Sequence, residues 1–322
     1  MIRDSGVRFL VLKLMLAYAL RRLLQFIPTI LAITLIMFLL LNVLPGDATL
    51  MAGGLRKEVD PKVMAAMRKQ FGLDKPIYVR YALYLKNLAT GDLGLSFLRR
   101  EKVNKLVGGR IWPTLKLAIV AMVVAVAVGI PLGFFSALRQ GSWLDTFSMV
   151  GAVSGVSIPQ FWLGLLLMYF FAVQLHILPA AGYGDWRYMI MPAITLGVGY
   201  MALLARATRA AVVEIFTTDY IRTARSKGLS ELRINRKHVL RNTLILVLTT
   251  AGLQFGALMG QTVIVEKLFS WPGIGSLLVD SIFQRDIPVT QGCILVIIVV
   301  FLLVNLTVDL LYALIDPRIE YK

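Results

Sequence analysis

The amino-acid sequence predicts an all-α integral membrane protein with six transmembrane helices. Of its 322 residues, 58% are hydrophobic and 16% are charged, whereas charged residues make up about a quarter of a typical soluble domain. The apolar residues lie in several runs that reach the roughly 20 residues a helix needs to cross a bilayer core. Basic residues lie mainly between these runs, as expected of loops at a membrane surface.

The six expected spans follow one another with polar segments between them. Pro45-Gly46-Asp47 closes the first span and Asp316-Pro317 ends the last, because proline does not continue a helix. The first run is too long for a cleavable signal peptide and has no A-x-A site, so we expect it to stay in the membrane. The expected spans cover about 23–44, 115–138, 147–173, 189–213, 243–265 and 292–315, the last five within a transmembrane core at 114–315.

Polar segments complete the expected organisation. The periplasmic segment 45–113 is expected to contain helical stretches such as Lys62–Phe71. The basic loop 214–242 is the sizeable cytoplasmic feature, and 266–291 is expected to form a re-entrant or surface segment with Glu266 at the outer surface. The other expected segments are the cytoplasmic N-terminal tail 1–22, the loops 139–145 and 174–188, and the cytoplasmic C-terminal tail 316–322.

Lysine and arginine predict the orientation. With the N-terminus inside, the cytoplasmic segments, counted together with Arg206 and Arg209 near the inner end of the fourth span, carry 17 basic residues, and the short outer loops carry three. The segment 45–113 carries 13 more, but it exceeds the roughly 60 residues within which the positive-inside rule is counted. We therefore expect both termini in the cytoplasm. The net charge of +16 then reflects this topology, and we expect no nucleic-acid partner.

The loop 214–242 has a helix–turn–helix pattern. Phe216, Tyr220 and Ala224 recur every four residues and are expected on one helix face. Gly228 suits the left-handed residue that ends a helix, and Ser230 suits the cap of the next one. The small Ala224 and Gly228 would let another protein approach closely. Two interpretations remain open: a solvated basic loop that only determines topology, and a docking element for a partner.

Polar side chains within the spans are costly in a bilayer and usually face a bundle interior or a water path. Pro159 precedes the first of them and is expected to bend the third span, because it removes a backbone hydrogen bond. Two roles remain open for each of these polar residues: it lines a transport pathway, or it joins helices. The five residues are Gln160, Gln254, Gln261, Asn305 and Asp309.

Small residues recur at helical spacing. Gly252, Gly256 and Gly260 repeat every four residues in the fifth span. Gly129 with Gly133, and Gly151 with Gly155, have the same spacing. Such faces permit close helix contact, either within this chain or with a second subunit.

The chain lacks the motifs of several chemistries. It has no G-x-x-x-x-G-K-[ST] loop for nucleotide phosphates. Cys293 is the single cysteine, so no disulfide forms within the chain, and His176 and His238 are too isolated for a metal site. No nucleophile–base pair is evident. We therefore expect no enzymatic activity and no bound cofactor or metal.

The basic loop resembles the EAA loop of bacterial ABC importer permeases, whose pattern is E-A-A-x-x-x-G. Arg222-Thr223-Ala224 stands in the E-A-A places and Gly228 is the glycine, so arginine and threonine replace the first two residues of the pattern. Residues 219–228 and 238–242 are similar to the R-T-A-R-x-K-G and H-x-L-R-N of the dipeptide, oligopeptide, nickel and glutathione branch. Further ordered matches are Tyr18–Pro28, Pro45-Gly46-Asp47, Phe71–Pro76, Gly91–Gly94, Phe269–Gly275, Arg285–Val289, Asn305, Asp309 and Asp316-Pro317-Arg318.

This resemblance implies a type I ABC importer permease in a bacterial inner membrane, the first of two permease chains. It implies a heterodimer with a homologous permease, two ATPase subunits that bind ATP and Mg, and an extracytoplasmic substrate-binding protein. The implied cargo is a dipeptide or oligopeptide, with glutathione and nickel chelates as alternatives. The implied coupling helix, which docks in a cleft of the ATPase, comprises Asp219, Tyr220, Ile221, Arg222, Thr223, Ala224, Arg225, Lys227 and Gly228.

Rival functions make different demands on the sequence. An ion-coupled secondary transporter usually has internal repeats and charged midplane residues, and neither is evident. A membrane scaffold or an intramembrane enzyme is the second rival. The basic outer stretch 56–110 either docks the substrate-binding protein or caps the outer mouth of the pathway.

Overall fold

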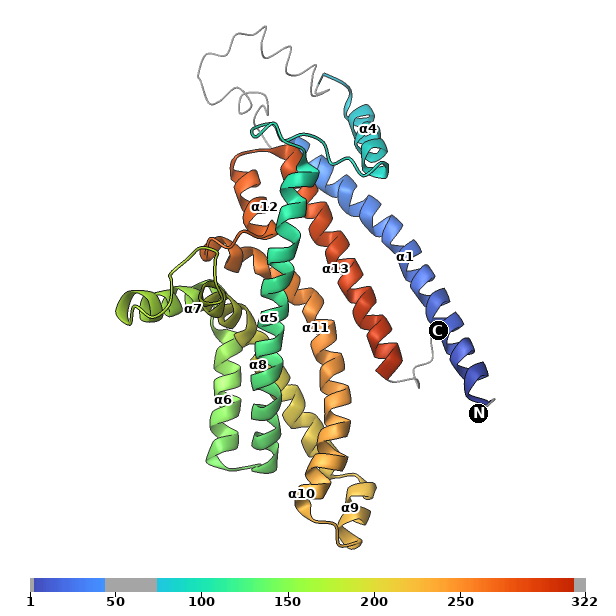
Figure 1. The fold of residues 1–322 in the computed structure, drawn as a ribbon, viewed down its shortest axis with the longest axis vertical. Helices are drawn as coiled ribbons and strands as arrows, with labels where there is room; N and C mark the ends of the chain where they lie inside the picture. Colours follow the sequence, from blue (N-terminus) through green and yellow to red (C-terminus); the bar gives the residue numbers. More distant parts are fainter. Residues whose placement is uncertain (1–2, 44–73, 316–322) are drawn as a thin grey trace. The chain divides into compact units, whose positions relative to one another are not determined.

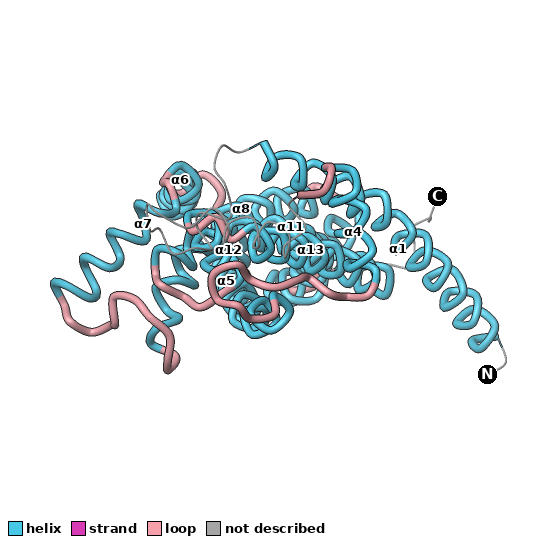
Figure 2. The backbone as a smooth tube through the Cα atoms, turned by 90° about the horizontal axis from the view of Figure 1, so that it is seen from above, coloured by secondary structure: helices cyan, strands magenta, loops and turns pink. Residues whose placement is uncertain are grey.

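The computed structural model describes the backbone of residues 3–43 and 74–315 and the side chains of 16–41 and 74–310. This part of the chain consists of helices and loops without a strand, which confirms the all-α prediction (Figure 2). Figure 1 shows the helices, which are α1 (Arg3–Val43), α4 (Ile77–Ala89), α5 (Val103–Leu138), α6 (Trp143–Ser157), α7 (Gln160–Leu167), α8 (Arg187–Phe216), α9 (Asp219–Ser226), α10 (Glu231–Arg233), α11 (Arg241–Leu268), α12 (Ile274–Phe283) and α13 (Ile287–Ile315), with π-helical segments η1 (Met168–Gln174) and η2 (Ile234–Leu240).

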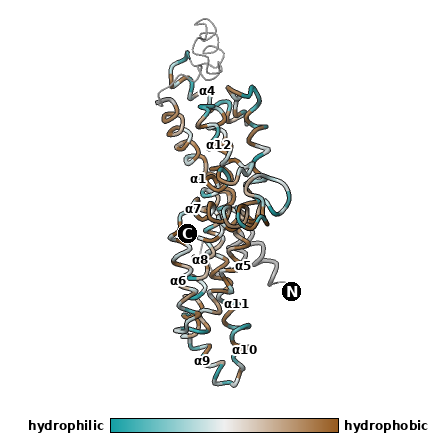
Figure 3. Tube along the Cα trace, turned by 90° about the vertical axis from the view of Figure 1, so that its left-hand side faces the viewer, coloured by the Kyte–Doolittle hydropathy of each residue, from teal (hydrophilic) through white to brown (hydrophobic). Residues whose placement is uncertain are grey.

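Five of these helical segments are long and apolar enough to cross a membrane, and a bent pair makes a sixth. Figure 3 shows hydrophobic colours along much of the helices and hydrophilic colours around α9 and α10. The predicted number of six spans is therefore confirmed when the bent pair counts as one. The five straight candidates are Leu16–Leu41, Val103–Leu138, Arg187–Phe216, Glu231–Leu268 and Ile287–Leu310.

The third span differs from the continuous helix predicted at 147–173. It is two helical parts, Trp143–Ser157 and Gln160–Gln174, bent by 105°. Pro159 has no N–H to donate, and a residue before proline is pushed towards extended backbone. Ile158 accordingly has φ −78° and ψ 124°. The bend was predicted, but the proline breaks the span rather than merely curving it.

Several boundaries also differ from those predicted. Helix α5 begins at Val103, twelve residues before the expected start of the second span, and α13 begins at Ile287. The segment 266–291 contains the short apolar helix α12. The predicted helical stretch Lys62–Phe71 lies outside the described residues.

Glu266 is wrongly predicted at the outer surface. Its side chain is fully buried near the end of α11. The chain turns back after this helix, and the Trp271 N–H donates to the Glu266 carbonyl over 2.8 Å. Phe269 and Trp271 are themselves buried, so these aromatic residues keep the segment inside the protein.

The described chain divides into two compact units. The first contains 3–19, 115–271 and 303–315, and here α8 packs against α6, α7 and α11. Glycines bring α5 against α8 in the same unit. A Cβ atom on Gly129 would lie 2.6 Å from the Met201 carbonyl oxygen, and one on Gly133 would clash with the Ala205 carbonyl oxygen. The predicted close contact at these two glycines thus forms within the chain.

Replacement of Gly133 by alanine is expected to destabilise the first unit. The added methyl group meets backbone, which has no flexible end to move aside, so we expect a loss of about 1–3 kcal/mol. The midpoint of thermal unfolding in detergent measures it. Gly151→Ala is the matched control, because its new Cβ atom meets nothing within 4 Å. Alanine also favours a helix by about 1 kcal/mol over glycine, so equal midpoints for the two variants would contradict the packing argument.

The three glycines of α11 differ in whether another helix lies against them. A Cβ atom on Gly252 would lie 2.6 Å from Val308, and one on Gly256 would lie 2.5 Å from the Asn305 side chain. These two glycines therefore allow α13 to approach α11. Gly260 is exposed and meets nothing within 4 Å, so the packing contact predicted for it does not occur within the described chain.

The second unit contains 20–43, 74–114 and 272–302 of the described chain. Its apolar core comprises Val103, Val107, Ile274, Leu277, Val289 and Cys293. Buried Asp286 accepts from the Ser96 hydroxyl over 2.5 Å and from the Phe97 N–H over 3.1 Å. The Thr114 hydroxyl accepts from the Ile274 N–H over 2.8 Å. These bonds tie α5 and the loop before it to the segment between α11 and α13.

Candidate functional site

Three of the predicted polar residues line one cavity of about 570 Å³. Gln160 begins α7 directly after the break at Pro159, whereas Gln254 and Gln261 lie on α11. The Gln160 side-chain amide donates to the Gln261 side-chain carbonyl over 2.6 Å. The broken span thus brings a glutamine against a helix that follows it by a hundred residues. Helix α8 supplies the third wall.

The α8 wall carries a residue that the sequence reasoning missed as a site candidate. Arg206 lines the cavity, although it was counted with the basic residues of the following loop. It lies ten residues before the end of α8, well within the helix. A charged residue within an apolar span was the available signal, because such residues are rare and usually functional.

Asn305 and Asp309 lie elsewhere. Asn305 lies against Gly256 at the contact between α11 and α13. The carboxylate of Asp309 accepts from the Tyr18 hydroxyl over 3.1 Å, which joins α13 to α1. Neither residue lines the cavity. Their contacts correspond to the second of the two predicted roles, the joining of helices.

Helix α9 has one buried face and one exposed face. Ile221 is fully buried and Ala224 is 6% exposed, whereas the charged side chains are exposed. The two apolar residues pack in a cluster with Ala137, Val212, Ile234 and Val239, which belong to α5, α8 and η2. Figure 1 shows α9 and α10 at the end of α8 and α11. The helix is thus attached to the transmembrane helices and presents a basic surface.

Polar contacts hold α9 on the other side. The Arg225 guanidinium donates to both Glu231 carboxylate oxygens, over 2.8 and 3.3 Å, across the turn at Gly228. These hydrogen bonds raise the pKa of Arg225 above its ordinary value. The Asn242 amide donates to the Tyr220 hydroxyl over 3.0 Å, which ties α9 to the start of α11.

The predicted surface of this helix needs two corrections. Helix α8 ends at Phe216, and two non-helical residues separate it from α9, which starts at Asp219. Phe216, Tyr220 and Ala224 therefore do not share one helix face. The buried pair is Ile221 and Ala224, and Ala224 contacts this chain rather than open space. Gly228 has φ +72° and meets nothing within 4 Å, so it retains an open approach.

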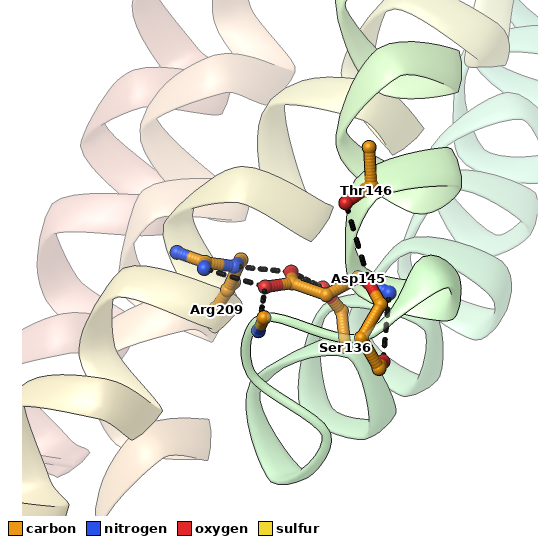
Figure 4. Close-up of polar contacts among 6 residues, drawn as sticks. Ser136, Asp145, Thr146 and Arg209 are labelled. Carbon is orange, nitrogen blue, oxygen red and sulfur yellow. Dashed lines mark hydrogen bonds and ion pairs between the residues drawn. The ribbon is translucent and has the colours of Figure 1, made fainter.

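An ion pair between a buried aspartate and a partly buried arginine lies near this end of the first unit (Figure 4). The Arg209 guanidinium of α8 donates to both oxygens of Asp145 on α6, over 2.6 and 2.8 Å. The same carboxylate accepts from the Ser136 hydroxyl of α5 over 2.6 Å and from the Gly141 N–H over 3.0 Å. Sequence reasoning missed this pair, because no local pattern connects residues 64 positions apart.

No metal centre is indicated in the part of the chain that the structure describes. Among those residues, no three histidine, cysteine, aspartate or glutamate side chains lie together as a metal ion requires.

Two families match the chain in succession. Residues 15–118 match the N-terminal family described as "Binding-prot-dependent transport system membrane comp, N-term", and 129–321 match "Binding-protein-dependent transport system inner membrane component". The chain is 47% identical over 309 residues to the glutathione transport system permease protein GsiC of Escherichia coli K12, covering 96% of this chain and all of the relative. The chain belongs to the ABC importer permeases of the peptide, nickel and glutathione family.

Other relatives of this permease have the same description. The GsiC proteins of Shigella dysenteriae serotype 1 and Salmonella paratyphi A are 47% and 45% identical over the same 309 residues. Among solved structures, two inward-facing forms of the MetNI methionine ABC transporter have TM-scores of 0.56 and 0.57 at 19% identity. Each covers 66% of this permease and 96% of the MetNI chain, and this likeness bears on the fold alone.

Family membership decides between the functions kept open by the sequence. The permease is a multi-pass inner-membrane component of an ABC importer with the type I fold, and not an ion-coupled secondary transporter. Members of this family are membrane permease components of such importers. A partner permease, an ATPase and a substrate-binding protein accompany such components in general.

Proposed function

We propose that this permease forms, with a homologous second permease, the path by which small peptides enter the cytoplasm. Two ATPase subunits, which bind ATP and Mg, drive the cycle through α9. An extracytoplasmic substrate-binding protein delivers the cargo, and both termini of the permease lie in the cytoplasm. Glutathione is itself a tripeptide, so the names of the relatives at 45–47% identity favour it as the first cargo to test.

The construction of α9 is the observation that carries the ATP-driven part of the proposal. Its apolar face is buried against the ends of transmembrane helices, and its basic face is exposed. A force applied to the exposed face therefore reaches α5, α8 and η2 through packed side chains, because packed cores transmit strain. A loop that only determined topology would not need a buried face.

The polar cavity supports the path. Its volume of about 570 Å³ falls within the range of roughly 300–1,000 Å³ that holds drug-sized ligands. Amide side chains donate and accept, so Gln160, Gln254 and Gln261 offer hydrogen bonds to a peptide backbone of any sequence. The break at Pro159 supports this role, since interrupted spans in transporters commonly form substrate sites.

Site-specific photocrosslinking tests the coupling role of α9. A photoreactive amino acid in place of exposed Arg222 is expected to capture a protein with a G-x-x-x-x-G-K-[ST] loop, identified by mass spectrometry in cells that express the whole transporter. The same amino acid in place of Tyr78, which is 73% exposed on α4, is the control and is expected to capture no ATPase. Failure at position 222 in an assembled, active transporter would refute docking through this helix.

Uptake by the complete transporter tests the cargo. Proteoliposomes that contain both permeases and the ATPases, supplied with the binding protein, are expected to accumulate labelled glutathione or a labelled dipeptide when ATP is inside with Mg. Vesicles without ATP are the control. Accumulation of a nickel chelate but of no peptide would contradict the proposed cargo while leaving the family assignment unchanged.

A further inference from the structure

We propose that Arg206 is the carboxylate-binding residue of the polar cavity, so that this permease is built for cargo with a free carboxylate. The inference deepens the proposed function and rests on it. Arg206 lines the cavity together with the three glutamines and Tyr200. The lining residues include no aspartate or glutamate, so the cavity carries one positive charge that nothing in its wall neutralises.

Two arginines one helical turn apart on α8 have opposite environments. Arg209 is held by Asp145 in a bidentate ion pair, as Figure 4 shows. Arg206 is exposed to the cavity and makes no hydrogen bond or ion pair within the described part of the chain. An arginine with a purely structural role needs an ion-pair partner, as Arg209 has in Asp145. An unpaired guanidinium in an apolar span has a reason to be there when an anionic ligand visits it.

The geometry of the guanidinium selects the ligand chemistry. Arginine presents its N–H donors as a planar fork, which matches the two oxygens of a carboxylate. Its charge repels a bare divalent cation. A small peptide with a free C-terminus carries this group, and glutathione carries two carboxylates. The cavity thus recognises its cargo by a feature common to peptides, and side chains contribute little to the selection.

The remaining polar groups complete a site for a peptide. Thr195 and Arg206 both line the cavity on α8, and their eleven-residue separation spans about 16 Å of helix. The Tyr200 hydroxyl between them is buried and has no hydrogen-bond partner within the described residues. A buried hydroxyl without a partner is unfavourable. A peptide whose carboxylate binds Arg206 and whose backbone amides bind the glutamines would lie along α8.

Import by three variants tests the inference in the complete transporter. Relative to wild type, Arg206→Gln is expected to reduce glutathione import about tenfold or more, as for the loss of one charge-assisted hydrogen bond. Arg206→Lys keeps the charge but lacks the planar fork, so it is expected to recover only part of the import. Arg187→Gln removes an exposed arginine from the same helix outside the cavity and is expected to import as wild type does. The midpoints of thermal unfolding should agree, because Arg206 makes no structural bond.

Chemical rescue separates charge from shape. Arg206→Cys is treated with a cationic or an anionic methanethiosulfonate reagent, and wild type treated alike is the control. Cys293, the cysteine already in the chain, is fully buried. The cationic reagent is expected to restore part of the import because it returns the charge without the planar fork, and the anionic reagent is expected to restore none. Equal import by all Arg206 variants would overturn the inference alone, as expected of an arginine that only reaches towards lipid headgroups. A wild type that imports no peptide would overturn the proposed function and this inference with it.

Discussion

Replacement of Gly228 by aspartate is expected to uncouple ATP hydrolysis from import. The residue lies in the turn after α9, with open space around it, so an added side chain meets no neighbour in this permease. At a docked ATPase it would place an unpaired carboxylate in the contact, where desolvation costs several kcal/mol. We therefore expect import to fall by about tenfold or more while the assembled complex still hydrolyses ATP.

Gly228→Asn is the matched control for this prediction. The positive φ of +72° disfavours most side chains, but asparagine and aspartate both tolerate it. The two variants therefore share the backbone strain and nearly the same size, and they differ in charge. Import and ATPase activity of both are measured in proteoliposomes. Undiminished import by Gly228→Asp, with intact assembly, would show that this turn does not meet the ATPase.

Loss of one partner from the Asp145–Arg209 pair is expected to give the largest fall in stability. The Asp145 and Arg209 side chains are 7% and 27% exposed, so Arg209→Ala leaves a buried carboxylate without its counter-ion. Removal of one partner of a fully buried pair costs about 3–5 kcal/mol, and this range is an upper bound here because Arg209 is partly exposed. The midpoint of thermal unfolding of the purified permease in detergent measures this loss. Import is expected to fall as well, because the pair joins α6 to α8.

A double variant provides the control. Asp145→Leu combined with Arg209→Met removes both charges and fills similar space, and such replacements of buried ion pairs are often neutral or stabilising. We expect its midpoint to lie well above that of Arg209→Ala. A double variant as unstable as the single one would mean that the Ser136 and Gly141 hydrogen bonds to Asp145 dominate the stability of this site.

The short basic helix shows how local sequence can be right in outline and wrong in detail. The turn at Gly228 and a helix on each side of it follow from residue types that act over a few positions. The face of α9 that is buried follows from where α8 ends. The sequence pattern continued the helix through Phe216, whereas the break before Asp219 resets the register and buries Ile221.

The polar residues show a second limit. The spans that hold Gln160 and Gln261 were predictable, since long apolar runs mark them. Their hydrogen bond joins residues 101 positions apart and depends on the 105° bend at Pro159. A proline predicts a bend, but the packing of α7 against α8 and α11 determines its size and direction.

The sequence by itself determined the helical class, the number of spans and the position of the basic helix, because hydropathy, charge and turn residues act over short stretches of chain. Only the tertiary structure decided which side chains meet. It gathered the glutamines and Arg206 on one cavity, and it paired Arg209 with Asp145 instead. The physical reason is that these contacts depend on how close small residues such as Gly133 let the helices approach, and that distance is a property of packing in three dimensions.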